Sequence, residues 1–237
     1  MDSHSASKPR VAAVRHPNES INLLASSHAF SQKGGSKTFA VGHLALGYIL
    51  GKTSAHFMKT NLNVPIVLTL SIIPDIDIII PFLQHRGPAH SIIVLFMVFV
   101  PIFAIYHKKA IPYFLALIQH PLIGDYIAGG RFQLLWPVTS QFYGGGLSIK
   151  SQTNITIEWT IFLTSIIIML KTKDMAIFFQ PHNSSLILSI PTFTVLLPTF
   201  LSFPLDVPIW LLPPHLVYTF LFSASIIFGI SKVLRSV

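Results

Sequence analysis

Residues 74–106 read PDIDIIIPFLQHRGPAHSIIVLFMVFVPIFAIY and join two contrasting kinds of sequence. The part up to Ser91 carries two aspartates, two histidines and an arginine, whereas the part from Ile92 onward carries no charged residue. A spanning helix needs about 20 mostly apolar residues, and ionisable groups within a membrane cost several kcal/mol unless they are paired or hydrated. The stretch therefore predicts a membrane helix that follows a functional polar cluster.

The rest of the chain shares this apolar character. Of its 237 residues 51% are hydrophobic and only 10% are charged, and the mean hydropathy is +0.65. Soluble domains average about 25% charged residues, so the composition favours an integral membrane protein. The absence of cysteine excludes disulfides, thiolate zinc sites and cysteine nucleophiles.

The net charge of +8 does not indicate a nucleic-acid partner. The basic residues lie at the ends of apolar runs and form no basic block with interleaved aromatic residues. Charges in such places orient membrane helices, so the expected partner is the lipid bilayer.

We expect an all-α fold, a polytopic integral membrane helical bundle of about seven helices. The expected ranges are 38–58, 63–83, 88–107, 111–129, 155–170, 185–203 and 212–231. The second and fourth helices are interrupted by Pro74 and Pro121, and such breaks occur only where backbone is buried in protein or lines a wet cavity. In the first helix, Gly47 and Gly51 are spaced for close helix packing.

The chain divides into a polar tail and a membrane domain. Residues 1–37 are polar and lack the apolar region of a signal peptide, so we expect a disordered tail. Residues 38–237 form the membrane helical domain, and the motifs described below lie within about 40–140.

Seven ionisable side chains fall toward the same membrane face in this arrangement, whichever way the bundle is oriented. They are His43, Asp75, Asp77, His85, His90, His120 and Asp125. Imidazole suits Zn, Fe or Mn and carboxylate suits Mg or Mn, so the mixture indicates a divalent metal ion whose identity stays open. A polar cluster that only ties helices together is the structural alternative.

Lysine and arginine in the short loops predict which side this face occupies. Loops on the cytoplasmic side carry an excess of these residues. The residues that we assign to the cytoplasm are Lys108, Lys109, Lys171, Lys173, Lys232 and Arg235. The protein is then a multi-pass cell-membrane protein with its polar site on the extracytoplasmic face.

Local spacing gives two further expectations. Asp75 and Asp77 would point about 200° apart on an intact α-helix, so they converge only if the backbone departs from the α-helix near Pro74. Pro88 suits the first position of a helix, which would leave the following N–H groups unpaired and able to bind an anion. The residues expected to hold a substrate anion are Arg86, Ala89 and Ser91.

In its ordered set of polar motifs the chain resembles the YdjM-type integral membrane proteins, which are described as metal-dependent hydrolases. The resemblance rests on GHLALGYILG (42–51), PDID (74–77), HRGPAHS (85–91), QHPLIGD (119–125) and LLWP (134–137), in that order. Two positions depart from the family pattern: Ala89 stands where the family has threonine, and His120 and Asp125 are five residues apart instead of four.

The resemblance implies that the seven ionisable residues are the polar positions of the family, together with Arg86 and Ser91. We expect the metal ligands to be His43, Asp77, His85, His90 and His120. Catalytic roles fall to Asp75, Asp125 and Arg86, where the two carboxylates either complete the ligand set or act beside it. Glu158, at the same level of the bundle, is a possible extra ligand or general base.

The most plausible activity is metal-dependent hydrolysis of a phosphoester in a lipid-linked or headgroup substrate. One alternative is a metal-ion or proton-coupled transporter, in which buried Asp and His would form the pathway, although no internal repeat of the kind common in transporters is visible. Another is a non-catalytic membrane protein with a structural polar cluster.

Overall fold

The computed structural model describes residues 40–128, 130–201, 205 and 207–236. Within these residues the fold is all-α, and each of the seven expected ranges contains a helix. The predicted all-α membrane bundle is thus confirmed. The tail predicted at 1–37 lies outside the described residues.

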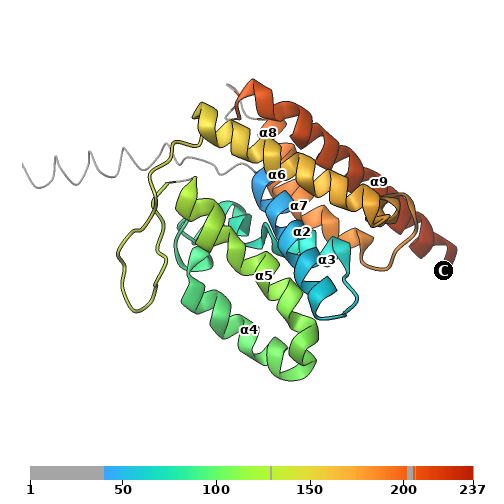
Figure 1. The fold of residues 1–237 in the computed structure, drawn as a ribbon, viewed down its shortest axis with the longest axis horizontal. Coiled ribbons are helices and arrows are strands. Elements are labelled where there is room, and N and C mark those ends of the chain that lie inside the picture. The colour runs from blue at the N-terminus through green and yellow to red at the C-terminus, as the bar shows by residue number, and fades with distance from the viewer. Residues whose placement is uncertain (1–39, 129, 202–204, 206, 237) are drawn as a thin grey trace, which may run out of the picture. The chain divides into compact units, whose positions relative to one another are not determined.

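Helix α2 (Ala40–Phe57) packs against both α5 (Ile111–Gln119) and α6 (Gln152–Lys171), so it lies between them (Figure 1). Its glycines make this close packing possible. A Cβ atom at Gly47 would overlap the Ser71 side chain, and one at Gly51 would lie 2.9 Å from Val67 Cγ1. The small-residue pair predicted from the sequence therefore has the expected packing role.

The second expected helix breaks into two pieces, and the break lies at Ser71–Ile72, before Pro74. Helix α3 (Val64–Leu70) ends where the Ser71 hydroxyl donates to the Leu68 carbonyl, and the 3₁₀ helix η1 (Ile73–Ile79) follows. The chain then continues through turns to Gly87. The predicted interruption is confirmed. Residues 80–83 were expected to be helical, but they are not.

The third expected helix begins later than predicted. Residues Pro88–His90 form the short 3₁₀ helix η2, and helix α4 (Ile92–Tyr106) starts after Ser91. The Ser91 hydroxyl accepts hydrogen bonds from the N–H groups of Ile93 and Val94 and so caps α4. Pro88 therefore opens a helix as predicted, but this helix is a short 3₁₀ turn, and the α-helix begins four residues later because Ser91 is its cap.

Helices α4 and α5 run in opposite directions and are joined by the 3₁₀ turn η3 (His107–Ala110), which contains Lys108 and Lys109 (Figure 1). At its end α5 widens into a π-helical segment, η4 (His120–Asp125). The predicted interruption at Pro121 therefore takes the form of a π-helix. Backbone bonds are redistributed there, and the helix is not broken.

The C-terminal half adds three more helical regions. Their bounds are η5 Asp174–Phe179, η6 Ser185–Leu188, α7 Ser189–Pro191, the π-helical η7 Thr192–Leu196, α8 Leu197–Leu201, η8 Ile209–Leu211 and α9 Leu212–Ser236. The second π-helix, η7, directly follows a proline, Pro191, whereas η4 begins one residue before Pro121. No ionisable side chain occurs between Ser185 and Leu201, so this second π-helix is not part of a polar site.

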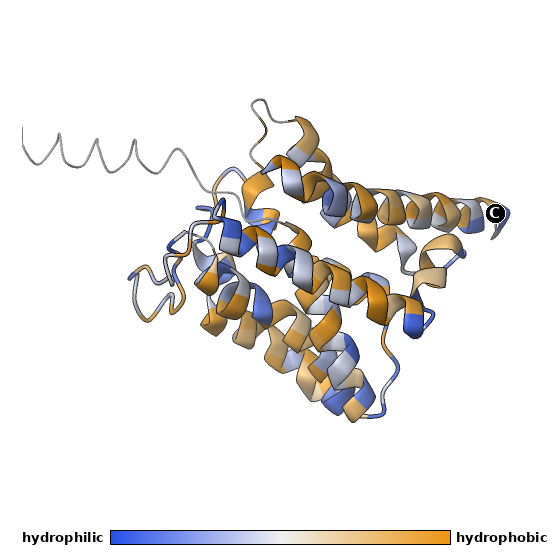
Figure 2. Ribbon diagram, turned by 45° about the horizontal axis from the view of Figure 1, so that its top comes forward, coloured by the Kyte–Doolittle hydropathy of each residue, from blue (hydrophilic) through white to orange (hydrophobic). Residues whose placement is uncertain are grey.

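The outer surface is suited to lipid. Three helical stretches among the described residues are long and apolar enough to cross a membrane: Ile92–Asp125, Gln152–Lys171 and Ile209–Arg235. The first of them contains the reversal at η3. Large apolar side chains are exposed on it and on α9, for example Ile105 at 69% and Phe220 at 63%, and most of the helical ribbon is hydrophobic in Figure 2. A soluble monomer rarely exposes so much apolar surface, so the structure supports a membrane location.

Candidate metal centre

The seven ionisable residues singled out in the sequence meet in one place, and we call them the His/Asp cluster. His43 comes from the first turn of α2, the two aspartates of PDID from η1, and His90 from the end of η2. His120 and Asp125 open and close η4. All are buried except His85, whose side chain is 23% exposed.

Four atoms of this cluster, which we call the donor quartet, face one another. They are Asp75 Oδ1, His90 Nε2, His120 Nε2 and Asp125 Oδ2. His90 Nε2 lies 3.3 Å from both carboxylate oxygens. His120 Nε2 lies 3.3 Å from the oxygen of Asp75 and 3.6 Å from that of Asp125.

These four distances are close to those between the ligands of a metal ion, and three of the donors, from Asp75, His90 and His120, all lie within 4.8 Å of one another. Ligand atoms about 2.0–2.1 Å from a tetrahedral zinc ion are about 3.3–3.4 Å from one another. Three of the four nitrogen–oxygen distances equal 3.3 Å, and the fourth is 3.6 Å. Two imidazoles and two carboxylates are also a donor set that divalent cations accept. The residues present therefore fit a metal ion.

His120 is held with one nitrogen directed at the quartet. Its Nδ1–H donates to the Ser71 carbonyl at 2.8 Å, which leaves the lone pair on Nε2. Among the described residues Nε2 has no hydrogen bond of ordinary geometry, although two carboxylate oxygens lie near it. Metal-binding histidines typically show this arrangement, in which a backbone carbonyl fixes the tautomer.

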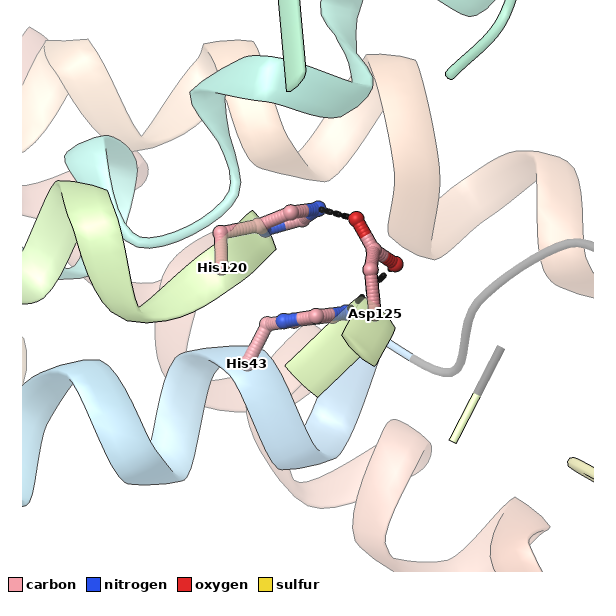
Figure 3. A group of neighbouring side chains, drawn as sticks. All are labelled: His43, His120 and Asp125. Atoms are coloured by element: carbon pink, nitrogen blue, oxygen red, sulfur yellow. Dashed lines mark ion pairs between the residues drawn. The ribbon is translucent and has the colours of Figure 1, made fainter. Parts of the chain in front are cut away.

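His43 lies against His120. Their rings stack with centroids 3.6 Å apart and planes inclined by 12°, and Figure 3 shows both rings beside the Asp125 carboxylate. His43 Nε2 is 3.8 Å from Asp125 Oδ1, the oxygen outside the donor quartet. A Cβ atom at Gly124 would overlap the His43 ring, so a glycine is needed there.

Asp77 supports His90 from the side opposite the quartet. Its Oδ2 lies 3.3 Å from His90 Nδ1 and accepts the backbone N–H of Arg86 at 3.0 Å. Its Oδ1 pairs with His85 Nδ1 at 2.8 Å. From the sequence, Asp75 and Asp77 were expected to converge on one point. They do not, because the 3₁₀ backbone places them at the two different nitrogens of the His90 ring.

His90, which precedes the apolar helix α4, is electrostatically bound to these carboxylates. Burial lowers the pKa of His90, but Asp75 and Asp77 outweigh it, together with the charge of Asp125, and raise the pKa to about 10. Burial raises the pKa of Asp77, but His85 and His90 outweigh it and bring that pKa below its usual value. The cluster thus favours positive charge at its centre, and a divalent cation supplies such charge.

The unusual spacing of five residues between His120 and Asp125 is explained by η4. A π-helix bonds residue i to residue i+5, so side chains five apart share one face, as side chains four apart do in an α-helix. Both residues consequently point to the same place, and Figure 3 shows the two side chains facing each other. The five-residue spacing therefore still brings the two side chains within 3.6 Å of each other.

Arg86 adds a cation at the edge of the cluster. Its guanidinium Nη2 lies 3.8 Å from Asp125 Oδ1, and its backbone has a φ of 63°. A Cβ atom at Gly130 would overlap Nη1, so the connection that follows η4 closes over this side chain.

The predicted anion site on backbone N–H groups does not form as expected. The N–H of His90 donates to the Gly87 carbonyl and that of Ser91 to the Pro88 carbonyl, at 3.0 and 3.1 Å. The Ser91 hydroxyl is used to cap α4, and Ala89 lies half-buried within η2. The 3₁₀ turn pairs two of the donors that an α-helix starting at Pro88 would have left open, so the anion site that we retain as a proposal centres on Arg86.

Among the described residues, the donor atoms that lie close enough to share an ion belong to the seven cluster residues. Glu158 lies near the cluster but is not one of them. It is buried in α6, its carboxylate accepts the backbone N–H of Gly42, and it lines a cavity together with His43. The expectation that Glu158 is a further ligand gains no support from this geometry.

Two residues with clear roles at the site escaped the sequence analysis. Ser71 supplies the carbonyl that orients His120, and Gln119 Nε2 donates to the carbonyls of His43 and Ser71 at 3.1 and 3.4 Å. Gln119 thereby ties α5 to α2 and to the end of α3. For Gln119 the sequence did offer a signal, namely an amide next to His120 in an apolar helix. For Ser71 it offered none, because the role belongs to its backbone carbonyl.

The comparison with known families agrees with the motifs. The family model described as YdjM inner membrane protein matches residues 39–202. This range contains every residue of the His/Asp cluster, Arg86 and Glu158. No curated protein and no solved structure matches the chain.

Proposed function

The chain belongs to the YdjM inner membrane protein family, and we propose that it is a membrane-bound metal-dependent hydrolase. The proposed substrate is a phosphoester in a lipid-linked or headgroup compound. The observation that supports the proposal is the donor quartet: its nitrogen–oxygen distances are 3.3–3.6 Å, and the donors of Asp75, His90 and His120 lie within 4.8 Å of one another.

In this proposal the ion is held by Asp75, His90, His120 and Asp125. When bound, a divalent cation supplies Lewis-acid chemistry, since it polarises a phosphoryl oxygen and makes water a better nucleophile at neutral pH. The ranking of residues differs from that made on sequence alone. Both PDID carboxylates were expected near the ion, but Asp75 now belongs to the ligand set and Asp77 supports a ligand.

The remaining cluster residues position the ligands. Asp77 holds the His90 ring through Nδ1 and is itself held by His85 and the Arg86 N–H. His43 packs flat against His120 and restricts the rotation of its ring. One ion is favoured over two, because a second ion at Asp77 and His85 would need Nδ1 of the same imidazole whose Nε2 belongs to the quartet.

Arg86 is the residue that we propose for the substrate anion. Its guanidinium lies beside the Asp125 carboxylate, at the edge of the quartet. A planar guanidinium matches two oxygens of a phosphate group. A phosphoester bound to the ion would thus be held from a second direction.

Metal analysis of the detergent-purified protein tests the proposal. We expect about one transition-metal ion per chain, lost in His120→Ala and in Asp125→Asn. His215→Ala is the matched control, since His215 is also fully buried but lies in α9 with its Nδ1 on the Leu211 carbonyl. Full metal occupancy in both cluster variants would refute the ligand assignment, as would a metal-free wild type after growth and purification with added zinc and manganese.

We also propose that the site faces the extracytoplasmic side, on the strength of the lysines at η3 and at the ends of α6 and α9. The chain has no cysteine, so single cysteines report position directly. Gln84→Cys should react with a membrane-impermeant thiol reagent in intact cells, and Lys109→Cys should not; both positions are exposed. The reverse pattern would place the site in the cytoplasm.

A further inference from the structure

A small cavity adjoins the metal centre on the side of α6. It has a volume of about 60 Å³ and lies between α2, η4 and α6. Its walls are mainly apolar and include Leu46, Ile123, Ile157 and Ile161. Ile157 is 38% exposed on the apolar outer surface, so the cavity borders the lipid-facing side of the bundle. We call it the Glu158 cavity, after the one carboxylate in its wall.

Glu158 is an unusual residue to find there. Its side chain is 8% exposed, and its Oε2 has no hydrogen-bond partner among the described residues. The backbone N–H of Gly42 donates to the carboxylate, and a Cβ atom at Gly42 would lie 2.6 Å from Oε2. The backbone of α2 thus holds the carboxylate in place, and within the described part of the chain its Oε2 has no hydrogen-bond partner.

A carboxyl group in such surroundings is stabilised either by taking up a proton or by a cationic partner. An unpaired charge inside a membrane protein costs several kcal/mol, and such groups are normally matched by a counter-ion or a hydrogen-bond donor. The part of the chain that the structure describes provides Gly42 N–H alone. A ligand with positive charge and N–H donors would complete the site.

The cavity is also close to the proposed phosphate position. His43 belongs to its wall, and His43 Nε2 lies 3.8 Å from Asp125 Oδ1. A single imidazole therefore separates the Glu158 cavity from the donor quartet. One ligand can reach both places if its phosphate and its cationic group are a short linker apart.

We propose that Glu158 recognises the primary ammonium group of an aminoalkyl phosphoester, so that the substrate class is an amine-bearing phospholipid headgroup. This inference rests on the proposed function for the phosphate end of the ligand. A cavity of 60 Å³ holds about four water-sized groups, which suits an aminoethyl group. The isoleucine-lined, lipid-facing wall favours a ligand that arrives from the bilayer.

Binding measurements on the purified full chain test the inference without requiring turnover. We would measure the affinities for short-chain phosphatidylethanolamine and phosphatidylglycerol by titration calorimetry, in detergent. Wild type should prefer the ethanolamine lipid by about tenfold or more, the scale of a hydrogen bond to a charged group. Glu158→Gln, which keeps the shape of the side chain, should remove the preference, and Gly42→Ala should reduce it by displacing the carboxylate.

Thr160→Val is the control, because Thr160 is exposed on the same helix; it should retain the wild-type preference. Equal affinity of wild type for the two lipids would overturn the inference, and so would a Glu158→Gln protein that keeps the preference. Soluble phosphoethanolamine provides the other arm: if it competes as well as the lipid at equal concentration, the ammonium ligand is a soluble ester, and if it does not, the ligand is a lipid.

The same measurement on His120→Ala separates the two proposals. A preference that persists in this variant and in a metal-free wild type supports ammonium recognition while the hydrolase proposal fails. If the wild type holds stoichiometric metal but shows no preference for the ethanolamine lipid, the ammonium inference fails while the metal-site proposal stands.

Discussion

Helix α2 contributes to two buried polar groups, and their geometries differ. Toward its middle, Lys52 Nζ lies 2.6 Å from Asp174 Oδ2, and the Tyr48 hydroxyl donates to the same oxygen at 2.7 Å. The Tyr48 hydroxyl also lies 3.3 Å from the Thr172 hydroxyl. We call this group the Asp174 network. Its charges and donors satisfy one another at normal hydrogen-bond distances.

At the start of α2, His43 joins the His/Asp cluster, where the inner distances are longer. The nitrogen–oxygen distances within the donor quartet are 3.3–3.6 Å, and His43 and Arg86 lie 3.8 Å from Asp125. The short contacts of the cluster are peripheral: His85 with Asp77 and His120 with the Ser71 carbonyl, both 2.8 Å.

The difference separates a structural polar group from a candidate site. Partners that donate directly to each other approach to about 2.7–2.9 Å, as in the Asp174 network. Atoms that share a cation stay about 3.3 Å apart, because each lies about 2 Å from the ion. In the His/Asp cluster, short hydrogen bonds at the edge orient the side chains, and the distances at the centre are a few tenths of an ångström longer. This arrangement is suited to binding a cation.

The largest expected effect on stability lies in the Asp174 network. Asp174→Asn should lower the free energy of unfolding by roughly 2–4 kcal/mol, because it leaves the half-buried Lys52 without a counter-charge. Asp75→Asn, measured in the same detergent with a chelator present, should cost less than Asp174→Asn, since the carboxylates of Asp77 and Asp125 still lie 3.3 Å from the His90 ring nitrogens when Asp75 is replaced. Thermal unfolding followed by circular dichroism measures both. Equal losses would show that the His/Asp cluster is structural too.

A smaller effect is expected where a residue supports a ligand. Asp77→Asn should weaken zinc binding by roughly 10- to 100-fold without abolishing it, the usual cost of removing a partner that orients a metal-bound histidine. Asp75→Asn, in contrast, should remove measurable binding. Competition with a chromophoric chelator gives both affinities. Complete loss in Asp77→Asn with retention in Asp75→Asn would restore the ligand order expected from the sequence.

Much of the site could be predicted because charged groups in an apolar chain have few places to go. Polar residues on different spanning helices must meet or reach water, so His43, PDID, HRGPAHS and the His120–Asp125 pair could be brought together from helix positions alone. The structure confirms their proximity. The family assignment, made on the same residues, is confirmed as well.

The remainder depended on contacts that no local pattern contains. Pro88 suits an α-helix and a 3₁₀ turn equally, and the decision is tertiary: the N–H of Ile92 donates to the Leu134 carbonyl, and the Ser91 hydroxyl donates to the Trp136 carbonyl. The approach of Gly42 to Glu158 joins positions far apart in sequence. The π-helix, by contrast, left a signal in the spacing of five residues between His120 and Asp125.

The smallest effect should come from the anion end of the site, at Arg86. We expect phosphate or vanadate to compete with substrate, and Arg86→Lys to weaken that competition by about tenfold. Lysine keeps the charge but loses the planar fork that meets two oxygens, and one charge-assisted hydrogen bond is worth about 1.5–3 kcal/mol. Metal content should stay normal, because Arg86 is not part of the donor quartet. Inhibition constants for phosphate and vanadate, measured together with metal content, provide the test. Since the N–H groups of His90 and Ser91 are already paired, Arg86 has no backbone donor beside it there to compensate for its loss. An Arg86→Lys protein with unchanged anion affinity and turnover would therefore contradict the phosphoester substrate and leave a metal centre whose substrate is uncharged.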